Sequence, residues 1–536
     1  MKRNLKSIPG QSGLIGIFII AAALILPGCT KNFEKYNTDP TKLSAAQTVA
    51  IAATAFGPME QAIYSNYQIA QNLSADAWAG YMMSPTNFRG GINNLNYALV
   101  DGWNSTGFND QYKLVMAPVS KIAQAGTATK APDVWAVALL IQVEAMDRVT
   151  DRFGPIPYTK AGSSLTSIPY DDQQTVYQTF FKQIDTAVIN LRAFTSNPAN
   201  AGKNPIGTGD LVYSGNYAKW QKFANSLRLR LAMRIVKADP TTAQQQAEKA
   251  MSDPAGLLTS PGDDAAVAQS GTRNNDLWTV TIAYNGDNHL NAAMGSYLDG
   301  FKDPRAPIYS VPATDGTYKG IRLGIDVSKG AYKTLASYNC LSTFTQTSPQ
   351  LIMTAAEMWF LRAEAALRHW KGVGGVVEDP QVDYETGITT SMQQWGVTPG
   401  TYLSDATSKQ VNYVDPINAA NSTPAISTIT IKWDPAATDE QKLERIITQK
   451  WIAIFPDGQE AWADYRRTGY PKLFPVAQNF STNPVIDATI QIRRIPYPSS
   501  EYQTNATAVA NGIKLLGGTG DNGNSRLWWD VNKGNF

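Results

Sequence analysis

Residues 351–369 read LIMTAAEMWFLRAEAALRH, an apolar stretch in which large side chains are interspersed with small ones. Pro349 precedes the stretch and Gly372 follows it, as is typical of the residues that flank a helix. A neighbouring helix can approach this surface closely because it carries Ala355, Ala356, Ala363, Ala365 and Ala366, as in proteins built from stacked helix pairs. We therefore expect a helix from about Leu351 to His369 that packs against other helices.

Four other stretches have the helical spacing of apolar residues. Apolar side chains recur at intervals of three and four residues over 112–123, 134–149, 220–231 and 443–454. Pro118 is expected to kink the first of these helices. No series of alternating strands with regularly spaced hairpin turns is apparent. The sequence therefore predicts an all-α, mainly helical fold, although periodicity alone gives no clean 34-residue repeat.

Long polar stretches separate the expected helices. They span residues 84–109, 259–288, 303–349 and 396–438, and they are rich in Gly, Asn, Asp, Thr and Pro. Irregular loops of this length are usually functional or disordered. Because these stretches also carry aromatic and amide side chains, we expect long irregular loops that form a ligand-binding face.

The N-terminus has the parts of a bacterial lipoprotein signal peptide. Lys2, Arg3 and Lys6 form a positive segment, and residues 14–26 are apolar and uncharged, too short to span a bilayer comfortably. The following Leu-Pro-Gly-Cys, ending at Cys29, has the form of a lipobox that is cleaved just before the cysteine. We expect a signal peptide over 1–28, a lipidated tether over 29–44 and one folded domain over 45–536.

Composition and motifs argue against several other functions. The formal net charge is +2, so no basic field points to nucleic acid. With Cys29 acylated, Cys340 has no disulfide partner. The two histidines, His289 and His369, belong to no zinc helix, and no motif nominates a catalytic carboxylate pair. We expect no enzymatic activity, no cofactor and no metal.

Two of the long stretches combine the side chains that sugar binding needs: flat aromatic faces and planar hydrogen-bonding groups. The candidates in the first region are Trp78, Asn87 and Trp103. Those in the second are Arg273, Asn275, Asp276, Trp278 and Tyr284. For each aromatic, packing of the loop on the scaffold is as good an interpretation as ligand contact. We prefer Trp278, which Asn and Asp flank, and expect it to face a pocket shared with the region from Trp78 to Trp103.

Several short runs occur in an order that spans nearly the whole chain after Cys29. They are NTDP (37–40), DRFGPIPY (151–158), FANSLRLRLA (223–232), DPR (303–305), AAE (355–357), LRAEA (361–365), QKW (449–451), EAWADYRRTG (460–469), RRIPYP (493–498) and WWD (528–530). With these runs the chain resembles the SusD/RagB family of nutrient-binding lipoproteins. The same runs are mostly structural on physical grounds, with Arg466 and Arg467 expected to pair within the scaffold and Gly469 to end a helix.

The resemblance implies a TPR-like helical scaffold, an outer membrane location facing the cell exterior, and a SusC-like TonB-dependent transporter as partner. It also implies an oligosaccharide as the usual ligand. Three functions remain open: a glycan-binding transport lipoprotein, the same lid capturing a peptide or another nutrient, and a helical scaffold that binds only proteins. The first predicts Trp or Tyr clustered beside Asn and Asp, whereas the third predicts a flat groove.

Overall fold

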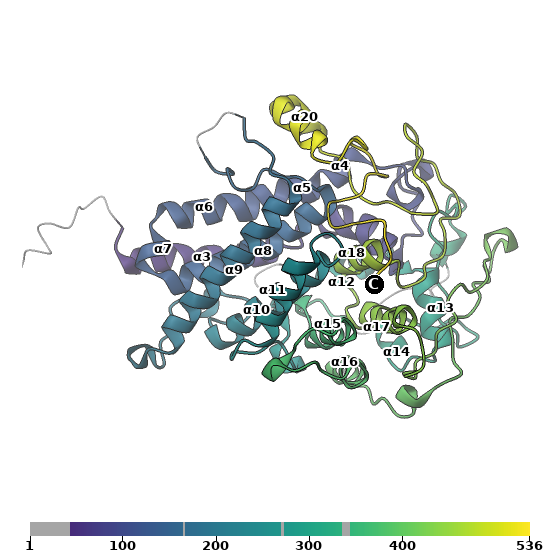
Figure 1. Ribbon diagram of the computed structural model, residues 1–536. Helices are drawn as coiled ribbons and strands as arrows, with labels where there is room; N and C mark the ends of the chain where they lie inside the picture. Colours follow the sequence, from purple (N-terminus) through teal and green to yellow (C-terminus); the bar gives the residue numbers. More distant parts are fainter. Residues whose placement is uncertain (1–42, 164–166, 270–272, 335–343) are drawn as a thin grey trace, which may run out of the picture. The chain divides into compact units, whose positions relative to one another are not determined.

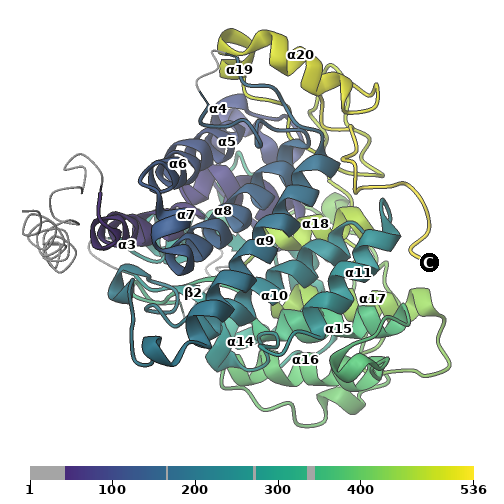
Figure 2. The same ribbon diagram turned by 60° about the vertical axis from the view of Figure 1, so that its left-hand side comes forward.

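Long helices pack against one another in succession. The computed structural model describes residues 43–163, 167–269, 273–334 and 344–536. In the stack, α8 (Pro132–Phe153) contacts α9 (Gln173–Thr195), α9 contacts α10 (Tyr217–Arg234), and α10 contacts α15 (Ala355–Leu367). Figures 1 and 2 show this order of helices.

Further helices pair with the members of this stack. Helix α11 (Pro240–Met251) packs on α10, and α16 (Pro380–Gln394) packs on α15. Helix α17 (Asp439–Ala453) contacts both α15 and α16, and α18 (Gly458–Thr468) contacts α10. The stacked helix pairs give the TPR-like, mainly helical fold that the sequence predicts.

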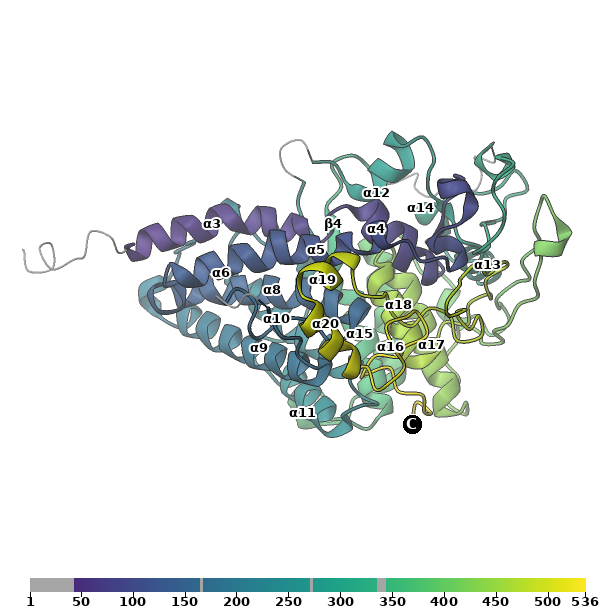
Figure 3. The same ribbon diagram turned by 90° about the horizontal axis from the view of Figure 1, so that it is seen from above.

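The remaining α-helices, π-helices and strands are short or lie at the margins of the stack. They are α3 (Ala45–Ala62), the π-helix η2 (Gln68–Asp76), β1 (Met82–Met83), α4 (Asp101–Asn104), α5 (Thr106–Gln111), the π-helix η5 (Tyr112–Met116), α6 (Ala117–Gln124), α7 (Thr127–Lys130), β2 (Ala265–Val267), α12 (Asp276–Trp278), the π-helix η9 (Thr279–Ala283), β3 (His289–Leu290), α13 (Ala292–Gly300), α14 (Ala306–Tyr309), β4 (Gln350–Met353), α19 (Ser499–Thr504) and α20 (Ala506–Lys514). Helices α13 and α14, with the long loops around them, lie away from α9 and α11 (Figure 3).

Local sequence signals set the ends of the stacked helices. The side chain of Asp172 accepts a hydrogen bond from the Thr175 backbone at the start of α9 (2.8 Å). Thr438 and Gln441 form a reciprocal capping box at the start of α17. Gly469 ends α18 with a φ of 81°, the left-handed conformation expected of a glycine at this position.

Two predicted helices have different boundaries in the structure. The helix expected from Leu351 begins instead at Ala355, because Gln350–Met353 form strand β4, which pairs antiparallel with β2. The helix expected over 112–123 is a π-helical turn followed by α6, with Pro118 in the first turn of α6. The helical backbone is continuous there, since the Ala117 N–H donates to the Tyr112 carbonyl, and Pro118, which has no N–H, follows directly. The stripes over 134–149, 220–231 and 443–454 are confirmed as α8, α10 and α17.

Residues Thr48–Phe536 form one compact unit, and Met1–Gln47 are assigned to another. The expected signal peptide, Cys29, most of the expected tether and Cys340 lie outside the described residues. Among the helices that are described, none is both long and apolar enough to cross a membrane.

Candidate ligand-binding site

A short strand pair brings the two predicted binding loops together. Strand β1 pairs antiparallel with β3, with Met83 opposite His289. The loop that leaves β1 therefore lies beside the loop that leads into β3. Asp287 fastens them, because its carboxylate accepts hydrogen bonds from the Thr86 hydroxyl and from the Gln68 amide (3.3 Å).

Buried amides hold the first loop in shape. The Asn93 side chain accepts a hydrogen bond from the Leu95 backbone (2.9 Å) and donates one to the Phe88 carbonyl (2.9 Å). The Asn94 side chain accepts one from the Val100 backbone (2.9 Å). Both asparagines are buried. The amide groups of this segment therefore mainly form hydrogen bonds within the loop itself, as buried polar groups need hydrogen-bond partners.

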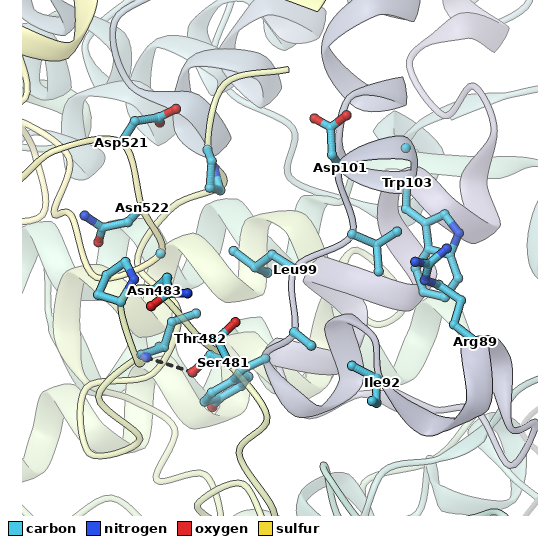
Figure 4. A pocket seen from close by; sticks show the side chains of 18 residues that line it. Arg89, Ile92, Leu99, Asp101, Trp103, Ser481, Thr482, Asn483, Asp521 and Asn522 are labelled. Carbon is cyan, nitrogen blue, oxygen red and sulfur yellow. Dashed lines mark hydrogen bonds between the residues drawn. The ribbon is translucent and has the colours of Figure 1, made fainter. Parts of the chain in front are cut away.

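The same loop turns sharply at Arg89, Gly90 and Gly91, which have φ values of 54°, 66° and 83°. Glycine adopts this left-handed conformation freely, whereas a residue with a side chain pays about 1–2 kcal/mol. Backbone strain of this kind clusters at ligand-binding sites. Figure 4 shows the Arg89 side chain beside Trp103.

These two residues lie on one side of a cavity of about 700 Å³. Three separate parts of the chain line it: residues 89–103, residues 481–486 with Pro496, and residues 521–523. Figure 4 shows Asn483, Asn522 and Asp521 on the side opposite Trp103, with Leu99 between. The volume lies within the range of about 300–1,000 Å³ that is usual for small-ligand sites.

The three walls are fastened to one another. The Phe480 backbone donates a hydrogen bond to the Asn96 carbonyl (2.8 Å), joining the second wall to the first. The Asn524 side chain donates one to the Val485 carbonyl (2.9 Å), joining the third wall to the second. Gly523 packs so closely on Ile486 that an added Cβ would lie 2.6 Å from its Cδ1. The cavity is therefore preformed by contacts within the chain.

The polar side chains of the cavity fall into two groups. Asp101 accepts hydrogen bonds from the Ser499 backbone (3.0 Å) and hydroxyl (2.7 Å), and Asp521 accepts from Arg494 and Tyr497. In contrast, no described residue hydrogen-bonds or pairs with the side chains of Arg89, Thr482 and Asn483, all of which are exposed. A guanidinium, a hydroxyl and an amide thus remain available in the cavity that the Trp103 indole lines.

The second predicted loop lines a different cavity, of about 390 Å³. Its walls include Arg273, Asp276, Tyr284 and residues 66–69. Arg273 donates to the Asp276 carboxylate (2.9 Å) and to the Tyr64 carbonyl (3.3 Å). Burial raises the pKa of Asp276, and the Arg273 charge opposes that rise. Among the described residues, no group of three or more His, Cys, Asp or Glu side chains is placed to hold a metal ion.

Two of the predicted ligand contacts are buried and form hydrogen bonds within the protein. Trp78 is buried in the core, where its indole N–H donates to the Asn94 carbonyl (3.0 Å) and its ring lies 4.9 Å from that of Trp462. Asn275 is buried as the N-cap of α12, accepting from the Leu277 and Trp278 backbones.

Among the described residues, Trp103 and Tyr284 line two distinct cavities rather than one shared pocket. Trp278 is half-buried and Asn87 is exposed, and neither lines either cavity. Tyr284 keeps 48% of its surface exposed.

The segment over 478–484, which includes part of the second wall, was not predicted as part of the site. It reads QNFSTNP over 478–484 and combines an aromatic ring with amides and hydroxyls. This is the same mixture that singled out the two earlier loops, so composition contained the signal. Its position opposite Trp103 could not be predicted from the sequence, because about 380 residues separate the two walls along the chain.

The chain matches known proteins along most of its length. The family model described as "SusD-like: Susd and RagB outer membrane lipoprotein" matches residues 32–530. A chitin-binding SusD homolog from Flavobacterium johnsoniae is 40% identical, with a TM-score of 0.85 over 90% of this chain and 100% of that one. A SusD homolog from Bacteroides vulgatus is 34% identical, with a TM-score of 0.83 over 90% of this chain and 98% of that one. No protein among the curated ones matches.

Proposed function

Because this chain belongs to the SusD-like family of outer membrane lipoproteins, we propose that it binds an oligosaccharide and passes it to a SusC-like TonB-dependent transporter. The binding site in this proposal is the cavity at Trp103. The observation that carries it is that a half-buried indole lines the same cavity as three polar side chains, Arg89, Thr482 and Asn483, that have no partner among the described residues.

The chemistry of the cavity suits a sugar. The flat face of an indole covers the C–H side of a pyranose, and the free guanidinium and amide groups donate hydrogen bonds to its oxygens. One free cation and two carboxylates line the cavity. This balance favours a neutral ligand over a strongly acidic one. Both carboxylates already accept hydrogen bonds from the protein, so the proposal is binding without hydrolysis.

Chito-oligosaccharides are the first ligands to test, because the F. johnsoniae protein is described as chitin-binding. Calorimetric titration against these and a wider glycan panel is expected to identify a ligand. Trp103→Ala should weaken its binding by about 2 kcal/mol, roughly thirtyfold, because a central aromatic anchor dominates a small interface. The matched variant Trp278→Ala removes an indole that lines neither cavity and should leave affinity nearly unchanged.

Three results would contradict this assignment. A larger loss for Trp278→Ala than for Trp103→Ala would move the site to the second loop, as the sequence alone suggested. Binding of peptides but of no glycan would favour the same protein as a lid for another nutrient. Absence of any small ligand would favour a scaffold that binds only proteins.

The anchor and the transporter form a separate part of the proposal. We place lipidated Cys29 at the start of the mature chain and the binding cavity at the cell exterior. Cys29→Ala should then release the protein from the membrane fraction. Pull-down of the native protein in mild detergent should recover a TonB-dependent barrel; repeated recovery of the lipoprotein alone would contradict the partnership.

A further inference from the structure

Another cavity, distinct from the one at Tyr284, adjoins the cavity at Trp103, and we call it the second cavity. It has a volume of about 320 Å³ and is lined by Thr86, residues 90–96, residues 324–328, Gln478 and Phe480. Ile92 lines both cavities. Phe480 lines the second cavity and Ser481, the next residue, lines the first. The segment around Ile92 and the segment over 478–484 therefore contribute to both cavities and form a shared wall.

Two large apolar side chains on this shared wall are left open to solvent. Ile92 is 57% exposed and Phe480 is 45% exposed. Both belong to segments that are held firmly, since the Phe480 backbone donates a hydrogen bond to the Asn96 carbonyl (2.8 Å). Exposed side chains of this kind gain free energy when a ligand covers them, at about 25 cal/mol per Å² of apolar surface.

Polar groups complete the second cavity. No described residue forms a hydrogen bond with the side-chain amide of Gln478, which is exposed. Asp326 is also exposed, and its Oδ1 accepts a hydrogen bond from the Ser328 backbone (2.8 Å). An exposed ring beside an amide and a carboxylate repeats the chemistry of the first cavity on a smaller scale.

We infer that the second cavity is an extension of the glycan site, which holds further sugar units of a chain that crosses Ile92. This inference rests on the function proposed above and adds the length of the ligand: an oligosaccharide that fills both cavities rather than a disaccharide. A single extended ligand explains the shared wall, because crossing from one cavity to the other covers both exposed side chains.

The test compares ligands of different length. Chito-oligosaccharides of two, four and six units are titrated calorimetrically against the full mature chain. The six-unit ligand should bind at least tenfold more tightly than the two-unit ligand. Phe480→Ala should weaken binding of the six-unit ligand about tenfold and leave the affinity for the two-unit ligand unchanged. The control Phe536→Ala removes a ring that is 56% exposed and lines neither cavity, and should change neither value.

Gln478→Ala gives a second variant that leaves the apolar wall intact, and it should show the same dependence on length. If all three ligands bind the native protein with equal affinity, the extension is overturned while the proposed function stands. If Phe480→Ala weakens the two-unit and six-unit ligands equally, the extension is likewise overturned. If none of the three binds, both this inference and chitin as the ligand fail.

Discussion

Trp78 and Trp103 lie 25 residues apart and perform different tasks. The Trp103 ring packs edge-on against Phe88, with ring centroids 5.9 Å apart, and remains half-buried in the wall of the cavity. Trp78 is enclosed and is 1% exposed. The difference decides what each substitution should do, because a buried ring contributes to folding and a wall ring to binding.

Trp78→Ala is expected to lower the free energy of unfolding by about 3–5 kcal/mol, the usual cost of removing a buried indole. Affinity for glycan, measured per folded molecule, should be unchanged. Urea denaturation and calorimetric titration measure the two quantities separately. A loss of affinity without a loss of stability would contradict this structural role and indicate that Trp78 contacts the ligand.

Asp264 provides a residue whose effect depends on pH. Its carboxylate accepts a hydrogen bond from the Ala355 backbone at the start of α15 (2.7 Å). Burial raises the pKa of Asp264 to about 7, and the neighbouring Asp263 charge adds to the rise. Because the folded pKa is raised, the stability that this group contributes is fully present below about pH 4 and is lost as pH rises through 7.

Asp264→Asn keeps an acceptor for Ala355 and removes the titration. The stability of the variant relative to the native protein should therefore increase between pH 4 and pH 8. Urea denaturation of both proteins at several pH values measures this difference. A difference that does not change with pH would show that Asp264 is not protonated in the folded protein.

At the level of elements, the loop between β1 and α4 depends on its asparagines. Asn94→Ala removes the acceptor for the Val100 backbone and the donor to the Asn104 side chain (2.9 Å). Leaving such buried groups unpaired costs about 1–3 kcal/mol. Affinity should fall as well, since the loop carries Arg89 and leads into α4, which carries Trp103. Asn87→Ala, on the exposed part of the same loop, is the matched control, and equal effects of the two variants would contradict this role.

Periodicity predicted the long helices but not their boundaries or the loops. Helices α8, α10 and α17 each have an apolar stripe strong enough to stand out from the sequence. Leu351–Met353 were assigned to a helix because a short apolar run fits a helix and a strand equally well. Only the partner strand β2, about 85 residues earlier, decides between them. Asn275 was predicted as a ligand contact because the sequence does not show that its side chain is buried.

At the scale of the whole molecule, the site depends on contacts that no local pattern encodes. Its three walls come from the first fifth and the last tenth of the chain, and hydrogen bonds such as that from Phe480 to Asn96 join them. The sequence identified Trp103 as a candidate because of its neighbours in the chain. The residues opposite Trp103 are set by how the helical stack brings distant segments together.

The stack itself is joined by buried charges. Arg230 on α10 contacts Glu357 on α15 (2.6 Å), and Lys450 on α17 contacts Asp464 on α18 (2.7 Å). Glu364 on α15 accepts two hydrogen bonds from Arg467 on α18 (2.6 and 2.8 Å) and two from Arg368 (2.8 and 3.1 Å). Glu364 is buried, and Arg368, which is partly buried, directly follows the last residue of α15. The pairs of Arg230 with Glu357 and of Arg467 with Glu364 link helices that are more than 100 residues apart in the sequence.

Glu364 should make the stability of the stack sensitive to acid. Burial alone would raise the pKa of Glu364, but the charges of Arg467 and Arg368 outweigh it and lower the pKa to about 2. Because the folded pKa is lowered, the stability that this carboxylate contributes is present above about pH 4.5 and is lost as pH falls through 2. Glu364→Gln removes the charge partner of Arg368 and one of the two carboxylates that pair with Arg467, which keeps Asp464 (3.0 Å). Breaking a buried pair by removing one partner costs about 3–5 kcal/mol, which is the loss expected at pH 7.

The loss caused by Glu364→Gln should shrink as pH falls from 4.5 towards 2, because the native carboxylate is then protonated as well. Asp315→Asn is the matched control, since Asp315 and Lys319 form an exposed pair four residues apart whose removal should change stability little. Guanidinium would screen these charges, so urea denaturation between pH 3 and pH 7 is the measurement. A loss of the same size for both variants, or one that is constant across this range, would mean that the buried pair does not join α15 to α18 in the way the geometry indicates.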